Sequence, residues 1–311
     1  MPPHECRGGG DNFEGGALAG VRVSAMLDFM RILITGGTGK IGRATVDRLR
    51  AAGHEATPAS RGGGGGGVSL ELRDAEAVER TARGYDAALL IMPLGPDEAE
   101  LGPRLVGALT GAGVRRIVAV GIQNAEAMRA IPHFEAKLPM QAAVVAVGGT
   151  VLACNWFMQN DLNALPAILH GGVYPLPVGG TGVFAVDTND IAAAAANALT
   201  SDAWAAREIP VCGPERLTGD GFAASWSAAL GRPVRYGGDD PAPFLEGMRR
   251  AMPVFDPWIE NDFRLMIEVT QQMGCEATPA DIATATEIVG RPLTRHIDFA
   301  HRALGQQENS R

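Results

Sequence analysis

The sequence contains few lysines and no cluster of basic residues. Of its 27 lysines and arginines only Lys40 and Lys137 are lysines, and the formal net charge is −8. Proteins that bind nucleic acids need clustered basic side chains to neutralise the phosphates. We therefore expect no direct nucleic-acid partner.

Cysteine and histidine are also sparse, and neither is spaced as a disulfide framework or a metal site requires. The four cysteines lie far apart without a Cys-x-x-Cys pair, which favours a reducing, cytoplasmic location. Among the six histidines, His296 and His301 are five residues apart, which puts them on different faces of a helix. No apolar run reaches the ~18 residues that span a bilayer. We expect neither a bound metal nor a membrane segment.

The N-terminal segment has no apolar core that could act as a signal peptide. Residues 1–29 are rich in glycine and mixed in charge, and no cleavage site follows an apolar stretch. We predict that residues 1–29 form a disordered tail, or that the natural start of the chain is Met30.

Short apolar runs alternate with segments of helical spacing between Met30 and Cys154. Runs of this kind that stop at glycine or proline are typical of buried parallel strands. The predicted strands are Met30–Thr35, His54–Ser60, Val68–Leu70, Ala87–Met92, Arg116–Val120 and Thr150–Cys154. The predicted helices are one that ends at Gly53 and those at Asp74–Arg83, Glu98–Gly111 and Phe134–Val147. This alternation predicts an α/β fold with a doubly wound parallel Rossmann sheet in residues 30–155.

Residues 156–311 have a different texture, with frequent glycine, proline and turn signals. Strand candidates at Val183–Val186 and Glu208–Cys212 alternate with helices at Asp190–Leu199 and Gly219–Leu230. From Pro241 onward the pattern is mostly helical. We predict a smaller C-terminal α/β lobe that holds a substrate or partner, and late strands that return to the sheet remain an alternative.

A glycine-rich loop follows the first predicted strand directly. Gly36, Gly39 and Gly42 have the GxxGxxG spacing that gives a tight turn, close approach to a pyrophosphate and a close helix–strand contact. The alternative is a tight turn that binds no ligand. The predicted cofactor contacts in this loop are Gly36, Thr38, Gly39, Lys40, Ile41 and Gly42.

The end of the second strand indicates which dinucleotide binds. Arg61 stands where an NAD-preferring site carries an acidic residue, and an arginine there accommodates a 2′-phosphate. We therefore expect NADP(H) as the cofactor, with NAD(H) possible, unless Arg61 is only a solvated loop residue. Met92 and Pro93, at the end of the fourth strand, are further predicted cofactor contacts because ligands bind outside the carboxyl ends of such strands.

Several segments together resemble the NmrA-like group of atypical short-chain dehydrogenases/reductases. The resemblance runs from Met30 to about Leu304 and implies a Rossmann domain, bound NADP(H) and a small C-terminal lobe over a cleft. The residues that carry it are ITGGTGKIG (Ile34–Gly42), IPHFEAK (Ile131–Lys137), TVLACNWFMQNDL (Thr150–Leu162), VDTNDIA (Val186–Ala192), CGPERLT (Cys212–Thr218) and ALGRPVRY (Ala229–Tyr236).

Ordinary members of that superfamily use a Tyr-x-x-x-Lys pair, in which tyrosine donates the proton and lysine holds the nicotinamide ribose. By this resemblance Lys137 is the predicted cofactor-holding and catalytic lysine. His133 stands in place of the tyrosine. Histidine titrates near neutral pH and can donate a proton, so His133 is a catalytic candidate. The alternative is a histidine that only caps or lines the start of its helix.

The segment after the sixth strand is the predicted substrate site. Asn155 and Asn160 offer hydrogen bonds and Phe157 an apolar wall at the carboxyl edge of the sheet. Simple core packing is the alternative for some of these side chains. The NmrA-like pattern usually has Arg-Pro where this chain has Ala153-Cys154, which puts any arginine-dependent contact there in doubt.

Two functions fit these motifs. The first is a reductase that transfers hydride from NADP(H) to a small quinone-like or aromatic substrate, because such acceptors depend less on a dedicated acid. The second is a non-catalytic redox sensor that acts through a regulatory protein partner, and a homodimer fits either. The sequence has no GxSxG elbow, Walker loop or zinc-ligand cluster, so nothing favours a hydrolase or a kinase.

Overall fold

The computed structural model describes Met1 and residues 29–252 and 254–308. The predicted tail, residues 1–29, therefore lies outside the described residues apart from Met1 and Phe29. Within the described part of the chain, no helix is both long and apolar enough to cross a membrane.

A seven-stranded sheet, in which every pairing is parallel, forms the centre of the molecule. Its order is β3-β2-β1-β4-β5-β6-β8. The strands are β1 (Arg31–Thr35), β2 (Glu55–Ser60), β3 (Val68–Ser69), β4 (Ala87–Leu90), β5 (Arg116–Ile122), β6 (Thr150–Cys154) and β8 (Arg207–Val211). The chain builds outward from β1 in one direction and from β4 in the other, so the predicted doubly wound Rossmann sheet is confirmed. The switch point lies between β1 and β4, where ligands bind in such folds.

Both faces of the sheet are buried, which explains why its central strands β1, β4, β5 and β6 are largely apolar. Ile32 and Ile34 of β1 contribute to one core, and Leu33 between them contributes to the core on the opposite face. Successive side chains of a strand point to opposite faces, so a strand that is covered on both sides needs apolar residues throughout.

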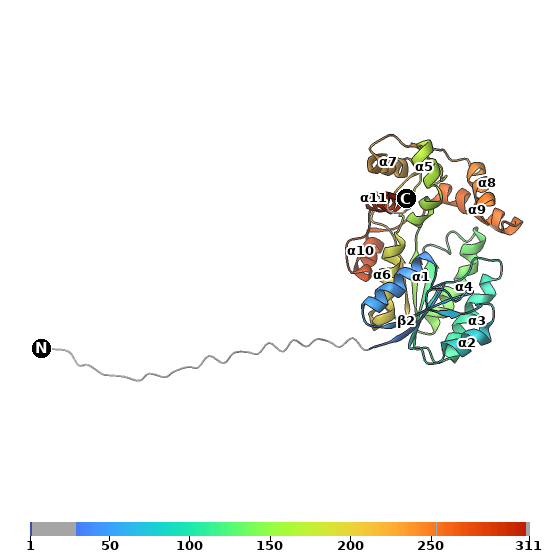
Figure 1. The fold of residues 1–311 in the computed structure, drawn as a ribbon, viewed down its shortest axis with the longest axis vertical. Helices are drawn as coiled ribbons and strands as arrows, with labels where there is room; N and C mark the ends of the chain where they lie inside the picture. The colour runs from blue at the N-terminus through green and yellow to red at the C-terminus, as the bar shows by residue number, and fades with distance from the viewer. Residues whose placement is uncertain (2–28, 253, 309–311) are drawn as a thin grey trace.

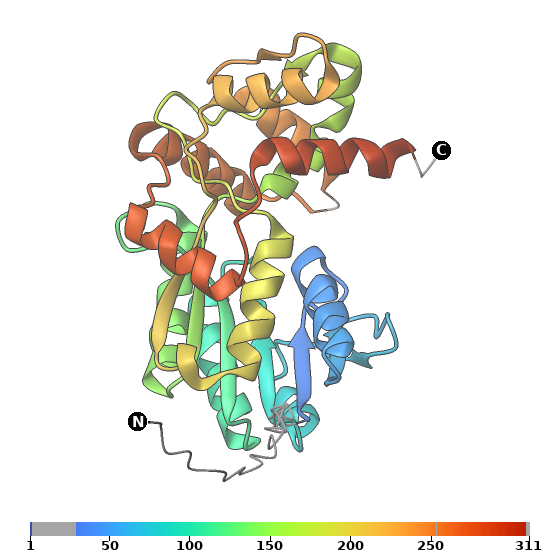
Figure 2. The same ribbon diagram turned by 90° about the vertical axis from the view of Figure 1, so that its left-hand side faces the viewer.

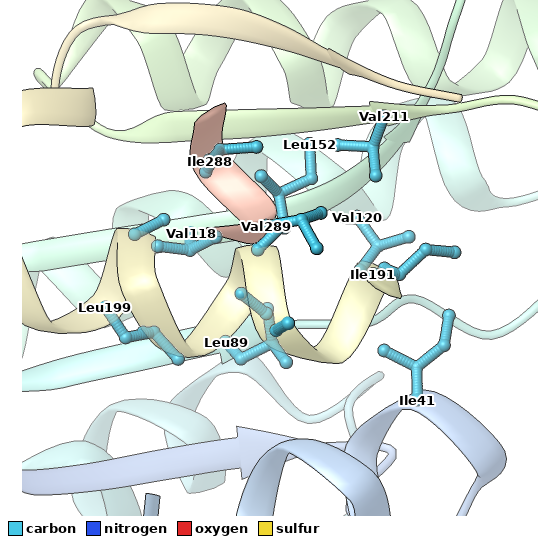
Figure 3. Packing of buried hydrophobic residues seen from close by; sticks show 14 of the residues in the cluster. Ile41, Leu89, Val118, Val120, Leu152, Ile191, Leu199, Val211, Ile288 and Val289 are labelled. Atoms are coloured by element: carbon cyan, nitrogen blue, oxygen red, sulfur yellow. The ribbon is translucent and has the colours of Figure 1, made fainter. Parts of the chain in front are cut away.

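Helices cover the two faces of the sheet as separate layers (Figure 1). One layer contains α1 (Lys40–Ala51), α6 (Thr188–Thr200) and α10 (Pro279–Val289). The other contains α2 (Ala75–Ala82), α3 (Glu98–Gly111) and α4 (Pro132–Ala146). Figure 3 shows the first layer from close by, where Ile191 of α6 and Val289 of α10 pack near Leu152 of β6.

The remaining elements form a C-terminal lobe at one end of the sheet (Figure 2). They are the short 3-10 helix η1 (Met158–Asn163), α5 (Leu165–Gly171), α7 (Gly219–Leu230), α8 (Ala242–Ala251), α9 (Pro257–Met273), α11 (His296–Glu308) and the strand pair β7 (Val173–Tyr174) and β9 (Arg235–Tyr236). A buried carboxylate organises the core of the lobe: Asp161 accepts hydrogen bonds from Tyr174 at 3.0 Å and Trp226 at 2.7 Å.

Two segments in the second half differ in how they use their strand-like sequence. β8 joins the main sheet beside β6, so the sheet takes a strand from beyond residue 155. Val183–Val186 is not a strand, although the sequence predicts one. Val183 and Val186 instead make single bridges to three separate segments, at Phe157, Leu217 and Cys275. Burial between several segments favours the same apolar residues as a sheet does, which is why the sequence signal was misleading.

After η1, a second short 3-10 helix, η2 (Asp202–Trp204), leads from α6 into β8.

The division of the chain near residue 155 stays a prediction, because the sheet itself spans both sides of that position.

Candidate functional site

The glycine loop between β1 and α1 is held in shape by backbone packing. Gly36 has φ +60°, a left-handed conformation that favours glycine. A Cβ on Gly42 would lie 2.3 Å from the carbonyl oxygen of Gly36. A Cβ on Gly37 would lie 2.5 Å from Cβ of Pro58 on β2. Gly36 therefore makes the tight turn that the spacing predicts. Gly42 packs against the loop backbone rather than against a strand, and Gly37 adds a close contact that the spacing did not identify.

Gly39 is different, because its surroundings are open. Its backbone is extended at φ −76° and ψ 174°, and an added Cβ would approach only the Gly36 carbonyl oxygen, at 3.1 Å. Directly after it α1 begins, without a capping side chain and without an acidic residue in the first turn. Free N–H groups at a helix start bind anions, so this end of α1 suits a pyrophosphate.

A groove of about 200 Å³ lies against the glycine loop and is called the loop groove below. Its lining residues are Gly36, Gly39, Lys40, Ile41, Gly42, Ile91, Phe157, Gln159, Asn160 and Thr188. The Lys40 ammonium donates a hydrogen bond to the Gln159 carbonyl at 3.4 Å. A cation and several backbone donors therefore border the same groove, which fits the phosphates of a dinucleotide.

Thr38 and Arg61 are predicted cofactor contacts that line neither the loop groove nor the cavity described next. Both are exposed. Thr38 lies beside Gly64 of the hexaglycine segment, which follows Arg61 at the end of β2. Because β2 is the neighbour of β1 in the sheet, Arg61 stands at the same edge as the glycine loop.

A second, largely apolar cavity of about 250 Å³ continues from the loop groove and is called the apolar cavity below. The two share Ile41, Ile91, Phe157 and Asn160. The remaining lining residues are Met92, Val120, Gly121, Ile122, Gln123, His133, Phe134, Lys137, Cys154, Asn155, Trp156, Met266 and Cys275. They follow the carboxyl ends of β4, β5 and β6 and reach into α4, α9 and the segment after α9. The predicted contact Met92 is among them, and Pro93 follows it, half-buried.

The thiols in this cavity behave as apolar wall. Burial raises the pKa of the Cys275 thiol to about 11 and raises that of Cys154 still further above its usual value. Both thiols therefore stay protonated at neutral pH and supply no nucleophile. The described residues contain no group of three side chains able to hold a metal ion.

Lys137 reaches the apolar cavity from α4 and pairs with a buried carboxylate. Its ammonium forms an ion pair with Glu98 of α3, which is 0% exposed, while the Lys137 side chain is 13% exposed. The second oxygen of Glu98 accepts a hydrogen bond from the backbone N–H of Gly95 at 3.0 Å. Glu98 thus fixes the position of the lysine, and its own charge is balanced by Lys137.

His133 lies one helical turn before Lys137, on the same face of α4. It too is held by a buried carboxylate, Asp262 of α9, which is 0% exposed. The His133 backbone N–H donates to Oδ1 of Asp262 at 2.8 Å, and its ring Nδ1 lies 2.6 Å from Oδ2. The histidine therefore lies at the start of its helix and also lines the cavity, so its catalytic role stays a prediction at this point.

The predicted substrate residues all line the apolar cavity, but their polar groups differ. The amide nitrogen of Asn155 donates to Gln123 at 2.9 Å and to the Cys275 carbonyl at 3.1 Å, and its oxygen accepts from the Trp156 N–H at 2.8 Å. Asn160, by contrast, makes no side-chain hydrogen bond within the described chain, and it borders both the loop groove and the apolar cavity. Of the two amides, that of Asn160 is the one available to a ligand.

Glu98 and Asp262 are the site residues that sequence reasoning missed. Glu98 is the first residue of α3, where an acidic side chain is ordinary because of the helix dipole. Asp262 lies within α9, next to Asn261, in a helix with many polar residues. Neither position carries a local signal that distinguishes a buried carboxylate from a solvated one.

Comparison with known proteins identifies relatives over most of the chain. The model of the NAD dependent epimerase/dehydratase family matches residues 32–100. The (4-alkanoyl-5-oxo-2,5-dihydrofuran-3-yl)methyl phosphate reductase of Streptomyces griseus subsp. griseus is 31% identical, with 86% of this chain and 96% of the relative covered. The NAD(P)H azoreductase of Xenophilus azovorans is 30% identical, with the same coverage of 86% and 96%.

Solved structures share the fold at lower sequence identity. The triphenylmethane reductase of Citrobacter sp., complexed with NADP(H), has a TM-score of 0.75 and 21% identity, covering 88% of this chain and 99% of its own. The NADPH-dependent quinone oxidoreductase of Escherichia coli, complexed with NADPH, has a TM-score of 0.74 and 19% identity, again covering 88% and 99%. At these identities the likeness extends to the fold alone.

Proposed function

The chain belongs to the NAD(P)-binding Rossmann-type oxidoreductases, and we propose that it is an NADP(H)-dependent reductase of small quinone-like or other aromatic acceptors. The observation that carries this proposal is the continuity of the loop groove with the apolar cavity, which share four lining residues. A redox sensor needs only the first of these spaces. An enzyme needs both, since the acceptor must lie beside the nucleotide.

The residues of the loop groove fit an NADP(H) molecule. The first turn of α1 and the open position at Gly39 would receive the pyrophosphate, and Lys40 would add charge there. Ile41, Met92 and Pro93 would border the nicotinamide half, and Lys137 would hold the adjoining ribose. When bound, the reduced nucleotide supplies a hydride.

The preference for NADP(H) over NAD(H) rests on Arg61. An exposed guanidinium at the end of β2 can pair with a 2′-phosphate, whereas an acidic residue there would repel it. The nucleotides in the two solved structures support the same choice, since they are NADPH and NADP(H).

The walls of the apolar cavity support an aromatic acceptor. Phe134, Trp156, Phe157 and Met266 offer flat or adaptable apolar surface, with Lys137 and His133 as the charged or titratable groups. An apolar cavity of about 150 Å³ holds one benzene, so the volume here is sufficient for a ring-sized group. The names of three compared proteins refer to azo, quinone and triphenylmethane acceptors.

We also assign the chain to the NmrA-like group within this family. The assignment is supported by the motif around Lys137, in which no tyrosine stands four residues earlier, and by the C-terminal lobe above the carboxyl ends of the strands.

Turnover tests the proposal directly. Purified protein is mixed with NADPH and, in turn, menadione, a neutral azo dye and the cationic dye malachite green, while nucleotide oxidation and dye bleaching are recorded. We expect oxidation with at least one acceptor, and none with the Gly39→Val variant. Tight NADPH binding without oxidation by any acceptor would overturn the reductase and favour a sensor.

A further inference from the structure

We infer that His133 is the proton donor for acceptors that take up a proton together with a hydride, and that Asp262 is the positioning residue that holds it for this role. The inference rests on the proposed reductase function. It divides the acceptors into two chemical classes: those that require His133, such as azo compounds, and cationic dyes that do not.

Asp262 directs both of its carboxylate oxygens to one residue. Oδ1 accepts from the His133 backbone N–H at 2.8 Å and Oδ2 lies 2.6 Å from ring Nδ1. In the inferred arrangement Asp262 is ionised and only accepts hydrogen bonds, so Nδ1 carries the shared proton. The other ring nitrogen, Nε2, has no hydrogen-bond partner among the residues that the structure describes, and the ring borders the apolar cavity. Nε2 is therefore the atom left to contact an acceptor.

Capping of α4 does not by itself account for this arrangement. The cap requires only the contact between Oδ1 and the backbone N–H, which a neutral side chain provides equally well. A carboxylate that is 0% exposed is costly to bury unless a positive partner balances it. The imidazolium form of His133 is that partner, because it donates to Asp262 through Nδ1 and keeps a second proton on Nε2.

The remaining charges at the cavity are already matched. Lys137 is the other ionisable cation that lines it, and Glu98 of α3 balances that charge. Asp262 of α9 faces His133 from the lobe. The thiols of Cys154 and Cys275 stay protonated because burial raises their pKa. His133 is thus the group at this cavity whose second ring nitrogen faces no partner among the described residues.

The chemistry of the acceptors decides whether that proton is needed. When an azo compound is reduced, the N=N π bond breaks, the hydride forms one N–H bond, and the Nε2 proton forms the other. The electron pair of the broken Nε2–H bond stays on the ring, which then regains a proton from water. Malachite green is a carbocation, so a hydride alone forms its new C–H bond and cancels its charge.

The experiment compares these two classes in matched variants. Asp262→Asn keeps an oxygen for the helix cap but places an amide donor against Nδ1, so the imidazolium ring loses its carboxylate partner. His133→Gln removes the titrating ring and keeps a hydrogen bond to Asp262, and it serves if the first variant folds poorly. Asp256→Asn is the control, because Asp256 caps the exposed start of the same helix through the Ile259 N–H at 2.9 Å.

We expect both test variants to lose ~10²-fold in azo reduction, the usual scale for a general acid, and to retain malachite green reduction within about twofold. In the parent protein, azo reduction should fall as the pH rises, because His133 can donate only while it carries the Nε2 proton. Malachite green reduction should show no such fall. Nitrogen NMR of labelled histidine, assigned with His133→Gln, should show a protonated Nδ1 that changes in Asp262→Asn.

Equal losses with both acceptor classes, or no loss with either, would overturn the inference while leaving the reductase function intact. A parent protein that reduces no acceptor would instead remove the proposed function. An unchanged Nδ1 signal in Asp262→Asn would also contradict the role of Asp262, whatever the rates.

Discussion

The loop groove takes half of its lining residues from one continuous stretch, Gly36–Gly42, whereas the apolar cavity is assembled from segments far apart in the sequence. At the loop, backbone N–H groups and the absence of side chains create the binding surface. In the cavity, the two functional side chains of α4 depend on carboxylates 39 and 129 residues away. The loop groove therefore depends mainly on local backbone geometry, and the apolar cavity depends on tertiary packing.

This difference predicts different consequences of substitution. At the loop, a side chain added in the open direction blocks a ligand without disturbing the fold. In the cavity, removal of one charged partner leaves the other buried and unpaired, so binding and stability change together. The following predictions use this contrast.

The largest effect on stability is expected when the Lys137–Glu98 ion pair at the apolar cavity is broken. Lys137→Ala should reduce the free energy of unfolding by about 3–5 kcal/mol, because Glu98 is then a buried charge without a partner. The double variant Lys137→Ala/Glu98→Gln should recover much of that stability and still bind NADPH weakly. Denaturant unfolding and NADPH titration measure the two effects. If the double variant regained full NADPH affinity, Lys137 would have no direct contact with the nucleotide.

At the loop, a matched pair of valine substitutions should separate binding from folding. The Cβ of Gly39→Val would lie 3.1 Å from the Gly36 carbonyl oxygen, a tight contact that a small shift relieves, so this variant should lose little melting temperature while losing NADPH binding. Gly42→Val would place its Cβ 2.3 Å from that same oxygen and should be destabilised by about 1–3 kcal/mol or more. Thermal unfolding and NADPH fluorescence test both. Normal NADPH binding by Gly39→Val would contradict the assignment of the loop.

How much of the site the sequence could predict follows from the same contrast. The glycine loop was predictable because its strand, turn and helix start are consecutive, and Lys137 because its motif is local. Glu98 and Asp262 could not be predicted, since only the packing of α3 and α9 against α4 distinguishes them from solvated acids. The prediction of a strand at Val183–Val186 was wrong for a related reason, because its apolar residues are buried by three separate segments rather than by a sheet.

Substitution of Arg61 should have a moderate effect on the preference for NADPH over NADH. Arg61→Ala should narrow the preference for NADPH over NADH by about 1–3 kcal/mol, as expected for a charge-assisted contact with phosphate. Because Arg61 is exposed, stability should stay within about 0.5 kcal/mol of the parent. Titration calorimetry with both nucleotides measures this preference. Equal affinities for NADPH and NADH in the parent would refute the assignment.

The smallest effect is expected from the two asparagines of the cavity. Asn160→Ala should weaken ligand binding by about 0.5–1.5 kcal/mol, the net value of one hydrogen bond, without loss of stability. Asn155→Ala should instead lower stability, because its amide makes three hydrogen bonds within the protein. Steady-state kinetics and thermal unfolding distinguish the two. A larger stability loss for Asn160→Ala than for Asn155→Ala would reverse their assigned roles.

The central claim is that hydride passes from a nucleotide in the loop groove to an acceptor in the apolar cavity. The most direct test is to supply NADPH that carries deuterium on the hydride-donating carbon and to analyse the reduced malachite green by mass spectrometry. The account predicts one deuterium on the central carbon of the dye, formed by the parent protein and not by Gly39→Val. Bleached dye without deuterium from either stereoisomer of the labelled nucleotide would contradict direct hydride transfer.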